Sequence, residues 1–352
     1  MFTADIVGNA LVFSPNSQSF AFRAGVGDKQ CIVVDGNQGP LYDQVDNPHF
    51  SPNNQCLAYA ARQGEHWFIV ADGEEGPRFK DAVEPVFSPD SRRIAYYAQA
   101  KDGRYLVVDD KLIGPHFTFG QSPFGMFRFS PDSQQISYVV QKAHKFLFLS
   151  YGHTEHVIAD GRKGKSYQRC GNLIFSPNSE QLGYLAYADK KYYVIIDEQS
   201  YGPYQDIRDD SPVFSPDSKM FAFSAYNLGV STVYVNGRAL DSYQLAYSPV
   251  FGPDGKHFAY LSDASGEYEI WVQPVGGGSA RRVTEDGAIW RFPPLWSPDS
   301  SMLIFGDKKK RLNVVDVDNG RVRVIDSSVH NDITDYSWAP DSLFVTYVKN
   351  NE

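Results

Sequence analysis

Phe13-Ser14-Pro15-Asn16-Ser17 is the first of nine copies of one short motif in this chain of 352 residues. The other copies begin at Phe50, Phe87, Phe129, Phe175, Phe214, Phe251, Trp296 and Trp338. Successive copies start 37, 37, 42, 46, 39, 37, 45 and 42 residues apart. A repeat of about 40 to 45 residues is typical of architectures that stack one supersecondary unit many times. The repeat therefore decides how the whole chain is organised.

The motif itself predicts a tight turn between two strands. Its Pro presets φ at the second turn position, and its Asn, Asp or Ser side chains can bond nearby backbone groups. A second strand follows each turn, as in Leu57-Ala58-Tyr59-Ala60, and a third strand rich in β-branched residues comes next, as in Tyr193-Val194-Ile195-Ile196. A polar hairpin then leads to a fourth strand. Each repeat therefore predicts one four-stranded antiparallel blade.

The sequence thus predicts an all-β protein with one domain, a single β-propeller over residues 1–352. We expect nine blades, with the last one built from two C-terminal strands and completed by residues 2–7 as an outer strand that closes the ring. Eight closed blades, or an open ring, are the alternatives. The middle residue of the second strand is small in seven copies, which would let neighbouring sheets pack closely: Ala21, Ala58, Ala95, Ser137, Gly183, Ala222 and Ala259.

Composition indicates a soluble globular protein, with 42% hydrophobic and 14% aromatic residues to fill a core. No apolar run approaches the roughly 18 residues of a membrane span, and the N-terminus lacks the features of a signal peptide. We expect a cytoplasmic protein, or a periplasmic one if an export signal has been removed. The net charge of −9, with dispersed Lys and Arg, argues against nucleic acid and membranes as partners. Cys31, Cys56 and Cys170 have no metal-ligand spacing and are expected to be reduced thiols.

Motifs that carry catalysis are missing from the sequence. The motif serines recur at one position of the repeat, which indicates a structural role and not a single nucleophile. There is no Gly-x-Ser-x-Gly elbow, no phosphate-binding Gly loop and no His-Glu-x-x-His pair. Carboxylate pairs such as Asp109-Asp110 and Asp209-Asp210 fit turns better than a Ca²⁺ site, which needs six or more oxygens. We therefore expect no enzyme activity, no cofactor and no metal.

His49 and Arg128 are candidate ligand contacts. Each directly precedes its motif aromatic, where other copies place Val12, Val86, Ile174, Val213, Val250 and Leu295. A polar group in this apolar register of the innermost strand must be paired if it is buried. We expect either a satisfied ion pair, a side chain that reaches the central channel, or a contact with a ligand there.

Candidate partner contacts lie in the second-to-third hairpins and fourth-to-first connections. These segments vary most between copies, and they should share the face opposite the motif turns. Aromatic and Arg side chains are the usual anchors of an interface. The candidates are Phe119, Phe124, Trp290, Arg291 and Tyr336. Each could equally be a loop residue packed against its own blade.

The repeated Phe/Trp-Ser-Pro-Asp-Ser/Gly unit resembles the TolB-like, WD-repeat-like propeller family along essentially the whole chain. The stretch from Phe258-Ala259-Tyr260 to Trp338-Ala339-Pro340-Asp341-Ser342 is similar to the propeller of tricorn-type proteases. That resemblance implies a non-catalytic domain that admits or selects peptides beside a separate serine protease core. Such a core is not present in this sequence.

These observations predict a non-enzymatic scaffold or interaction module that binds a peptide or protein on its variable face and channel mouth. The alternative is a substrate-gating propeller domain detached from a tricorn-like protease, and a propeller glycan hydrolase or lyase is a weaker possibility. The third-to-fourth hairpins change style near residue 251, so a composite or engineered repeat protein with no natural ligand also stays open. We expect a monomer, or weak self-association at the closing seam.

Overall fold

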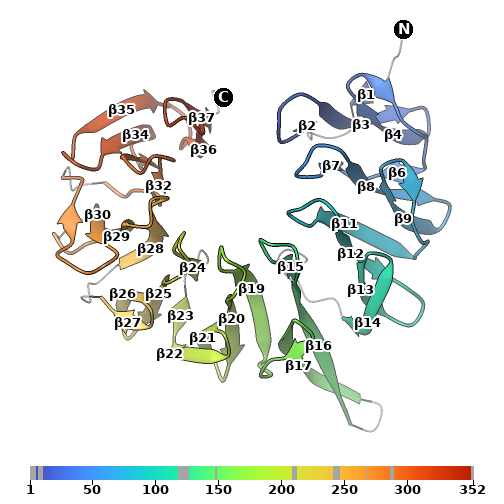
Figure 1. Cartoon of the computed structure of the whole chain (residues 1–352), viewed down its shortest axis with the longest axis horizontal. Coiled ribbons are helices and arrows are strands. Elements are labelled where there is room, and N and C mark those ends of the chain that lie inside the picture. The colour runs from blue at the N-terminus through green and yellow to red at the C-terminus, as the bar shows by residue number, and fades with distance from the viewer. Residues whose placement is uncertain are drawn as a thin grey trace. The chain divides into compact units, whose positions relative to one another are not determined.

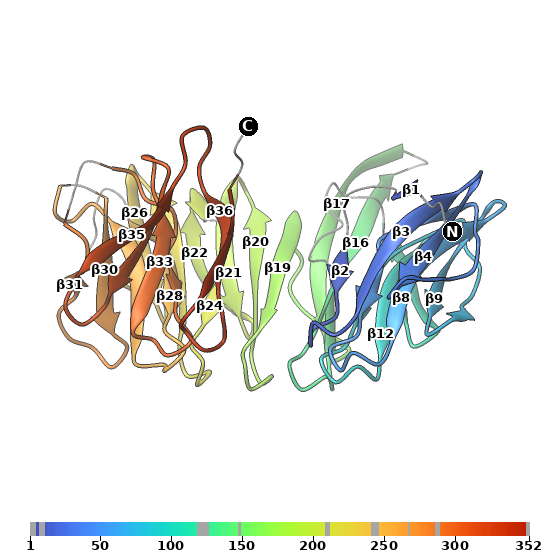
Figure 2. The same cartoon turned by 90° about the horizontal axis from the view of Figure 1, so that it is seen from above.

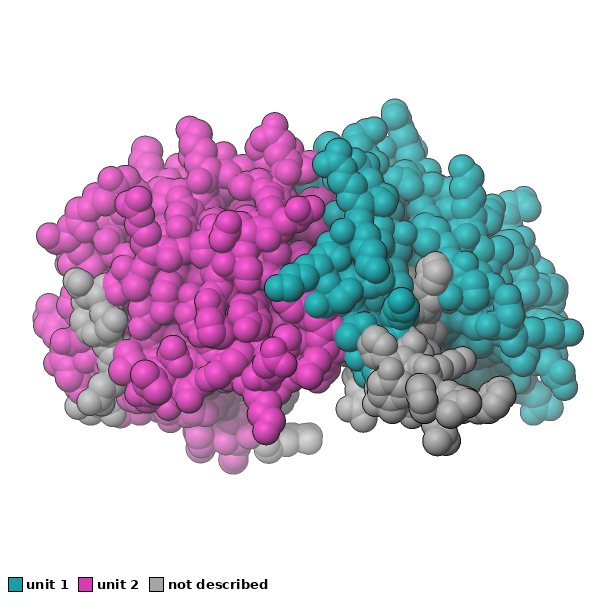
Figure 3. Space-filling model, turned by 90° about the horizontal axis from the view of Figure 1, so that it is seen from below, with its two compact units in different colours: residues 1–166 teal, residues 167–352 magenta. Residues whose placement is uncertain are grey.

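The computed structural model describes residues 5–6, 11–117, 127–146, 149–207, 212–240, 246–266, 268–285 and 289–349. Every regular element in these ranges is a β-strand, which confirms the expectation of an all-β protein. No helix in these ranges is long and apolar enough to cross a membrane. The chain divides into two compact units, Met1–Ser166 and Tyr167–Glu352 (Figure 3).

The described part of unit 1 contains four antiparallel sheets (Figure 1). The first sheet holds β1 (Asp5–Ile6), β2 (Val12–Phe13), β3 (Phe20–Val26), β4 (Lys29–Val34) and β5 (Asn37–Gln38). The second holds β6 (Gln44–Val45), β7 (His49–Phe50), β8 (Leu57–Gln63), β9 (His66–Ala71) and β10 (Glu74–Glu75). The third holds β11 (Asp81–Phe87), β12 (Ile94–Gln99), β13 (Arg104–Val108) and β14 (Lys111–Phe117). The fourth holds β15 (Phe127–Phe129), β16 (Ile136–Phe146), β17 (Leu149–Ala159) and β18 (Arg162–Lys163).

The described part of unit 2 contains five sheets. The fifth sheet of the chain holds β19 (Arg169–Phe175), β20 (Leu182–Ala188), β21 (Lys191–Ile196) and β22 (Gln199–Tyr204). The sixth holds β23 (Asp206–Ile207), β24 (Val213–Phe214), β25 (Phe221–Asn227), β26 (Val230–Val235) and β27 (Arg238–Ala239). The seventh holds β28 (Ala246–Phe251), β29 (His257–Ser262), β30 (Glu269–Pro274) and β31 (Arg281–Arg282). The eighth holds β32 (Leu295–Trp296), β33 (Met302–Gly306), β34 (Arg311–Asp316) and β35 (Val322–Ser327), and the ninth holds β36 (Thr334–Trp338) and β37 (Val345–Val348).

The first eight sheets follow the predicted order of the repeat, the ninth keeps its first two strands, and the motif lies at the end of the first strand. β16 and β17, of eleven residues each, are the longest strands in the described chain and form a hairpin that Figures 1 and 2 show from two sides. The first strand is commonly interrupted about three residues before the motif aromatic, by a bulge or by a split into two short strands. Asn172, Ser248 and Asp335 occupy this position with φ of 52°, 53° and 52°. A bulge of this kind bends the strand and redirects the side chains that precede it.

The motif turn has one geometry throughout. Its fifth residue has a positive φ in all nine copies, between 57° and 67°. In the seven copies with a serine at the second position that serine is buried, and its Oγ accepts a hydrogen bond from a backbone N–H five residues later, as in Ser88 and Arg93 at 3.0 Å. The same Oγ donates to the Asp or Asn of the motif, as in Ser88 to Asp90 at 2.6 Å. These serines are therefore structural parts of the turn.

A second set of hydrogen bonds joins the motif turn of one sheet to that of the next. The backbone N–H of the fourth motif residue donates to the side-chain oxygen of the fifth residue in the following copy, and we call this bond a clasp. In unit 1 the clasps run from Asn16 to Asn54 at 2.8 Å, from Asn53 to Ser91 at 2.9 Å and from Asp90 to Ser133 at 2.9 Å. In unit 2 they run from Asn178 to Ser218 at 2.9 Å, from Asp254 to Ser300 at 3.0 Å and from Asp299 to Ser342 at 3.0 Å. Gly255 has no side-chain oxygen, so the Asp217 amide has no clasp acceptor at that position.

The core lies between successive sheets of a unit. The predicted small residues of the second strands are buried, with Ala21, Ala58, Ala95, Ser137, Ala222 and Ala259 fully inaccessible. At Gly183 an added Cβ would lie 3.0 Å from Ile196 of its own sheet and 3.0 Å from Pro212, which precedes β24. This spacing confirms that small residues allow the close approach of neighbouring sheets. The motif aromatics continue the contact, because Trp296 Nε1 donates to Val250 O of the preceding sheet at 3.0 Å.

The N-terminal strand departs from the prediction. Asp5 and Ile6 pair with Gly25 and Ala24 of β3, so β1 forms the first half of an interrupted first strand in the first sheet. The prediction that residues 2–7 complete the last sheet is therefore wrong for β1. Because the first strand of this sheet is split, β2 pairs with only the start of β3, and β1 can pair with the rest of β3. Among the described residues, the ninth sheet consists of β36 and β37 alone, the two C-terminal strands that the sequence predicts.

Candidate functional site

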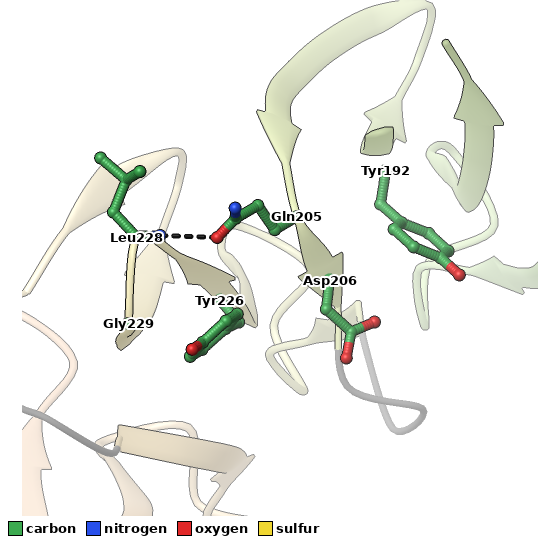
Figure 4. A pocket seen from close by; sticks show the side chains of 6 residues that line it. All are labelled: Tyr192, Gln205, Asp206, Tyr226, Leu228 and Gly229. Atoms are coloured by element: carbon green, nitrogen blue, oxygen red, sulfur yellow. Dashed lines mark hydrogen bonds between the residues drawn. The ribbon is translucent and has the colours of Figure 1, made fainter. Parts of the chain in front are cut away.

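An open hollow of about 880 Å³ lies between the fifth and sixth sheets of unit 2 (Figure 4). We call it the main hollow. Tyr192 of β21 lines one side, and the sixth sheet contributes the other side. The lining residues are Tyr192, Gln205, Asp206, Tyr226, Leu228 and Gly229. They come from a second-to-third hairpin, a fourth-to-first connection and the strands next to them, which are the segments where the sequence predicts a variable face.

Strand register brings Asp206 and Tyr226 to one face of the sixth sheet. Asp206 of β23 is directly opposite Tyr226 of β25, and paired residues of antiparallel strands share a face. The Gln205 backbone N–H donates to Tyr226 O at 3.0 Å. Figure 4 shows the Asp206 carboxylate between the ring of Tyr192 and the ring of Tyr226. One carboxylate and two phenol rings therefore face the same open space.

Leu228 forms the rim of the main hollow and is unusual in two respects. It occupies the first position of a two-residue hairpin with φ of 51°, followed by Gly229 with φ of 88°. Asn, Asp or Gly normally takes this position because a positive φ is costly for a bulky side chain. The Leu228 side chain is 85% exposed, and the Leu228 N–H donates to Gln205 Oε1 at 2.7 Å. The chain thus holds a large apolar side chain in solvent at the edge of the hollow.

A second hollow of about 400 Å³ adjoins the first and shares Tyr192 as a common wall. It lies at the bulge of β19 and is lined by Arg169, Cys170, Gly171, Asn172, Leu185, Ala186, Tyr187 and Tyr192. The Tyr187 and Tyr192 rings pack at 4.8 Å between centroids. We call the two hollows together the tyrosine groove. Its walls combine tyrosine and aliphatic side chains with polar and charged ones, and aromatic side chains are common anchors of binding surfaces.

His49 and Arg128 lie in unit 1, and both side chains are exposed on the first strands of their sheets. The register is apolar in six of the other copies, but it is not buried throughout, because Val86 and Leu295 at the same position are 43% and 41% exposed. Desolvation by neighbouring protein atoms lowers the pKa of His49 even so, while the Asp46 carboxylate acts in the opposite direction. Neither residue lies in the tyrosine groove, so their role as ligand contacts stays a prediction.

Arg291 is not a surface anchor. It is 2% exposed and forms an ion pair with Glu269, which is 1% exposed, at 3.2 Å between Nη2 and Oε2. It also donates to the backbone oxygens of Tyr268 and Ile289. The predicted partner contact at Arg291 therefore does not hold, because the buried guanidinium, whose residue forms a β-bridge with Asp307 beside the eighth sheet, neutralises the buried Glu269 carboxylate of the seventh sheet.

The remaining predicted contacts have different outcomes. Trp290 is 38% exposed and packs on Tyr268, with 4.7 Å between ring centroids. Tyr336 is half-buried, donates to Pro293 O at 3.1 Å and accepts from Gly306 N at 3.3 Å, so its hydroxyl is occupied within unit 2. Phe119 and Phe124 lie outside the described residues. Among the described members of this group, Trp290 keeps a large exposed aromatic surface.

The three cysteines form no disulfide, as the sequence predicts. Cys31 is buried, and burial raises the pKa of its thiol. The described ranges contain no group of three or more His, Cys, Asp or Glu side chains arranged to hold a metal ion.

Sequence reasoning missed the residues of the tyrosine groove. They come from two sheets and from positions far apart in the chain, so no short motif marks them. One local signal was present. Asn227-Leu228-Gly229 places Leu at a hairpin position where a residue suited to positive φ is normal. A leucine that contradicts the turn chemistry is a sign of a function at that position.

Comparisons with known proteins give one family match and alignments with two solved structures. Residues 159–352, more than half of the chain, match the family model described as the TolB beta propeller domain. The crystal structure of TolB from Acinetobacter baumannii aligns with 14% identity over 82% of this chain and 72% of that chain, at a TM-score of 0.38. Dipeptidyl peptidase 4 from Porphyromonas gingivalis aligns with 12% identity over 93% of this chain and 60% of that chain, at a TM-score of 0.48. No curated protein sequence matches the chain. By its family match, the chain belongs to the TolB β-propeller domain family.

Proposed function

We propose that this chain is a non-enzymatic propeller module that binds an extended segment of a peptide or protein partner in the tyrosine groove. The observation that carries the proposal is Leu228, which is held 85% exposed at the rim with a positive φ. Burial of a leucine side chain is worth about 2 kcal/mol. A partner that covers Leu228 would recover this energy.

The groove also supplies the other elements of a peptide-binding surface. Tyr192 and Tyr187 present rigid rings with little conformational entropy to lose, and such side chains are common anchors of interfaces. The volumes of about 880 and 400 Å³ are of the order of known ligand pockets. Because the two hollows share Tyr192, one segment could cross both and bury the ring from two sides.

The lining of the main hollow favours binding over catalysis. Its six residues include one carboxylate and no histidine, cysteine or serine. A nucleophile with a neighbouring base is therefore missing from this set, and glycoside hydrolysis normally uses a pair of carboxyl groups. This composition supports the non-enzymatic reading.

A peptide library displayed on phage would test the proposal. Peptides selected on the wild-type chain are expected to lose binding to Leu228→Ser and to keep binding to Lys190→Ser. Lys190 is a matched control, because Asp189–Lys190 forms the corresponding hairpin of the fifth sheet with φ of 51° and 60° and is also exposed. Failure to enrich any peptide, or selected peptides that ignore Leu228→Ser, would overturn the proposal.

We further propose that the nine sheets are nine blades of one closed ring. The support comes from the motif aromatics, which pack on the preceding sheet: Phe129 and Phe214 are 6% and 9% exposed, whereas Phe13 of the first sheet is 58% exposed. Closure would bury Phe13 in the same way. A compact chain of this length has a radius of gyration of about 20 Å. Small-angle scattering that gives a clearly larger radius would contradict closure.

A further inference from the structure

We infer that the main hollow selects a basic side chain, arginine above lysine, from the segment that it binds. This inference rests on the proposed function and adds the chemistry of the bound residue. The lining of the main hollow is acidic: Asp206 is the one carboxylate among its six residues, and none of the six is basic. A cation that enters the hollow therefore meets one opposite charge and no like charge from the lining.

The Asp206 carboxylate keeps bonding capacity for a ligand. Its Oδ1 accepts a hydrogen bond from the Ile207 N–H at 2.9 Å, and Oδ2 has no hydrogen-bond or ion-pair partner among the described residues. The residue is exposed on β23, so this oxygen is open to the hollow. A guanidinium can donate two parallel N–H bonds to a carboxylate, whereas an ammonium acts as a point charge.

The two tyrosines define what can surround that cation. Figure 4 places the Asp206 carboxylate between the Tyr192 and Tyr226 rings, and neither phenol hydroxyl has a hydrogen-bond partner within the described chain. Aromatic faces attract cations, and a planar guanidinium can also stack on them. The phenol oxygens add acceptors for the remaining N–H groups. The set of one carboxylate and two rings fits a flat cation with several donors better than a neutral or acidic side chain.

Leu228 adds an apolar contact beside the site for the charged group. An arginine carries an apolar three-carbon stem before its charged head, and such stems pack on apolar surface while the head finds its partner. Leu228 at the rim can contact the stem or a neighbouring apolar residue, while Asp206 of the same lining can contact the charged head. The expected motif in a partner is an arginine next to an apolar residue in an extended segment.

The test uses two small probes, N-acetyl-arginine methylamide and N-acetyl-glutamine methylamide, in NMR titrations of the full chain. The arginine probe should bind at least fivefold more tightly than the glutamine probe. Asp206→Asn should remove most of this preference, and Tyr226→Leu should weaken it more than Tyr226→Phe, because phenylalanine keeps the ring face. Asp189→Asn is the matched control, since Asp189 is an exposed aspartate of the neighbouring sheet outside the main hollow.

The outcomes separate this inference from the proposed function. If both probes bind equally, or if Asp206→Asn leaves the preference unchanged, the inference is wrong even where phage-selected peptides still depend on Leu228. If no peptide depends on Leu228, the proposed function fails first. Peptides that bind to Asp206→Asn as well as to wild type, while still sensitive to Leu228→Ser, show that this variant folds and that the carboxylate has no part in selection.

Discussion

Ser133→Ala tests whether the clasps hold neighbouring sheets together. Ser133 is 3% exposed, has φ of 64°, and accepts the Asp90 N–H at 2.9 Å from the preceding sheet. Alanine keeps a Cβ in the same backbone conformation, so the strain of the positive φ is unchanged. The substitution therefore removes the clasp acceptor and little else.

The expected cost is about 1 kcal/mol, the net value of one hydrogen bond in a folded protein. A buried N–H without an acceptor would cost more than this. Asp90 is exposed, so water can bond to its amide in the variant, and the expected cost stays at about 1 kcal/mol. A change of 1 kcal/mol corresponds to about a fivefold change in an opening equilibrium. The Asp90 amide should therefore exchange with solvent about five times faster in Ser133→Ala than in the wild-type chain.

Hydrogen exchange resolved by residue is the assay, and Ser133→Asn is the control. Asparagine takes this position naturally at Asn54, whose Oδ1 accepts the Asn16 N–H at 2.8 Å. Ser133→Asn should therefore retain most of the protection of the Asp90 amide. The reasoning is refuted if Ser133→Ala leaves that amide unchanged, or if Ser133→Asn is as damaging as Ser133→Ala.

Three further predictions follow from the same structure. Gly255→Ser should supply the missing clasp acceptor, since an added Cβ there meets nothing within 4 Å, and the Asp217 amide should then exchange more slowly; equal exchange rates would contradict this. Glu269→Gln should lower the free energy of unfolding by about 3–5 kcal/mol in urea denaturation, because it leaves the buried Arg291 guanidinium without its countercharge; a loss below about 1 kcal/mol would count against a buried ion pair. The motif serine hydroxyls lower the pKa of Asp90, Asp217 and Asp299, so the stability from these carboxylates is present above their unfolded pKa of about 4 and is lost as the pH falls through the folded values. Thermal melting between pH 6 and pH 3 should show this loss, and Asp90→Asn, which copies the natural Asn53, should reduce it; a variant with the full wild-type acid dependence would refute the assignment for Asp90.

The repeated architecture could be predicted because each copy of the motif carries its own turn chemistry. The proline, the buried serine and the small residue of the second strand act within about ten residues, so their pattern is legible along the chain. Ala58 and Gly183 behave as expected for this reason. The clasp was not foreseen, because its donor and acceptor belong to different copies and its donor is a backbone group.

The candidate site could be predicted only as a face of variable loops. Arg291 is predicted on that surface because Arg side chains are common interface anchors, but its partner Glu269 lies 22 positions earlier and its burial depends on a pairing that no local pattern shows. His49 was placed in an apolar register that is half-exposed in the folded sheets. Tyr192 and Tyr226 line the main hollow from two different sheets, and no local pattern of the sequence shows which residues of two sheets will line one hollow.

The clasp has a consequence for the history of such chains. Its donor is a main-chain amide, which every residue except proline supplies, and its acceptor is a small side chain at a fixed place in the motif. Every copy except the seventh, which has Gly255 at the acceptor position, can therefore offer the same bond to its neighbour. When a gene gains or loses one whole repeat, the new neighbours inherit a working junction without a compensating substitution. The motif acts as a common connector that lets the number of repeats drift while the loops at the opposite ends of the sheets diverge.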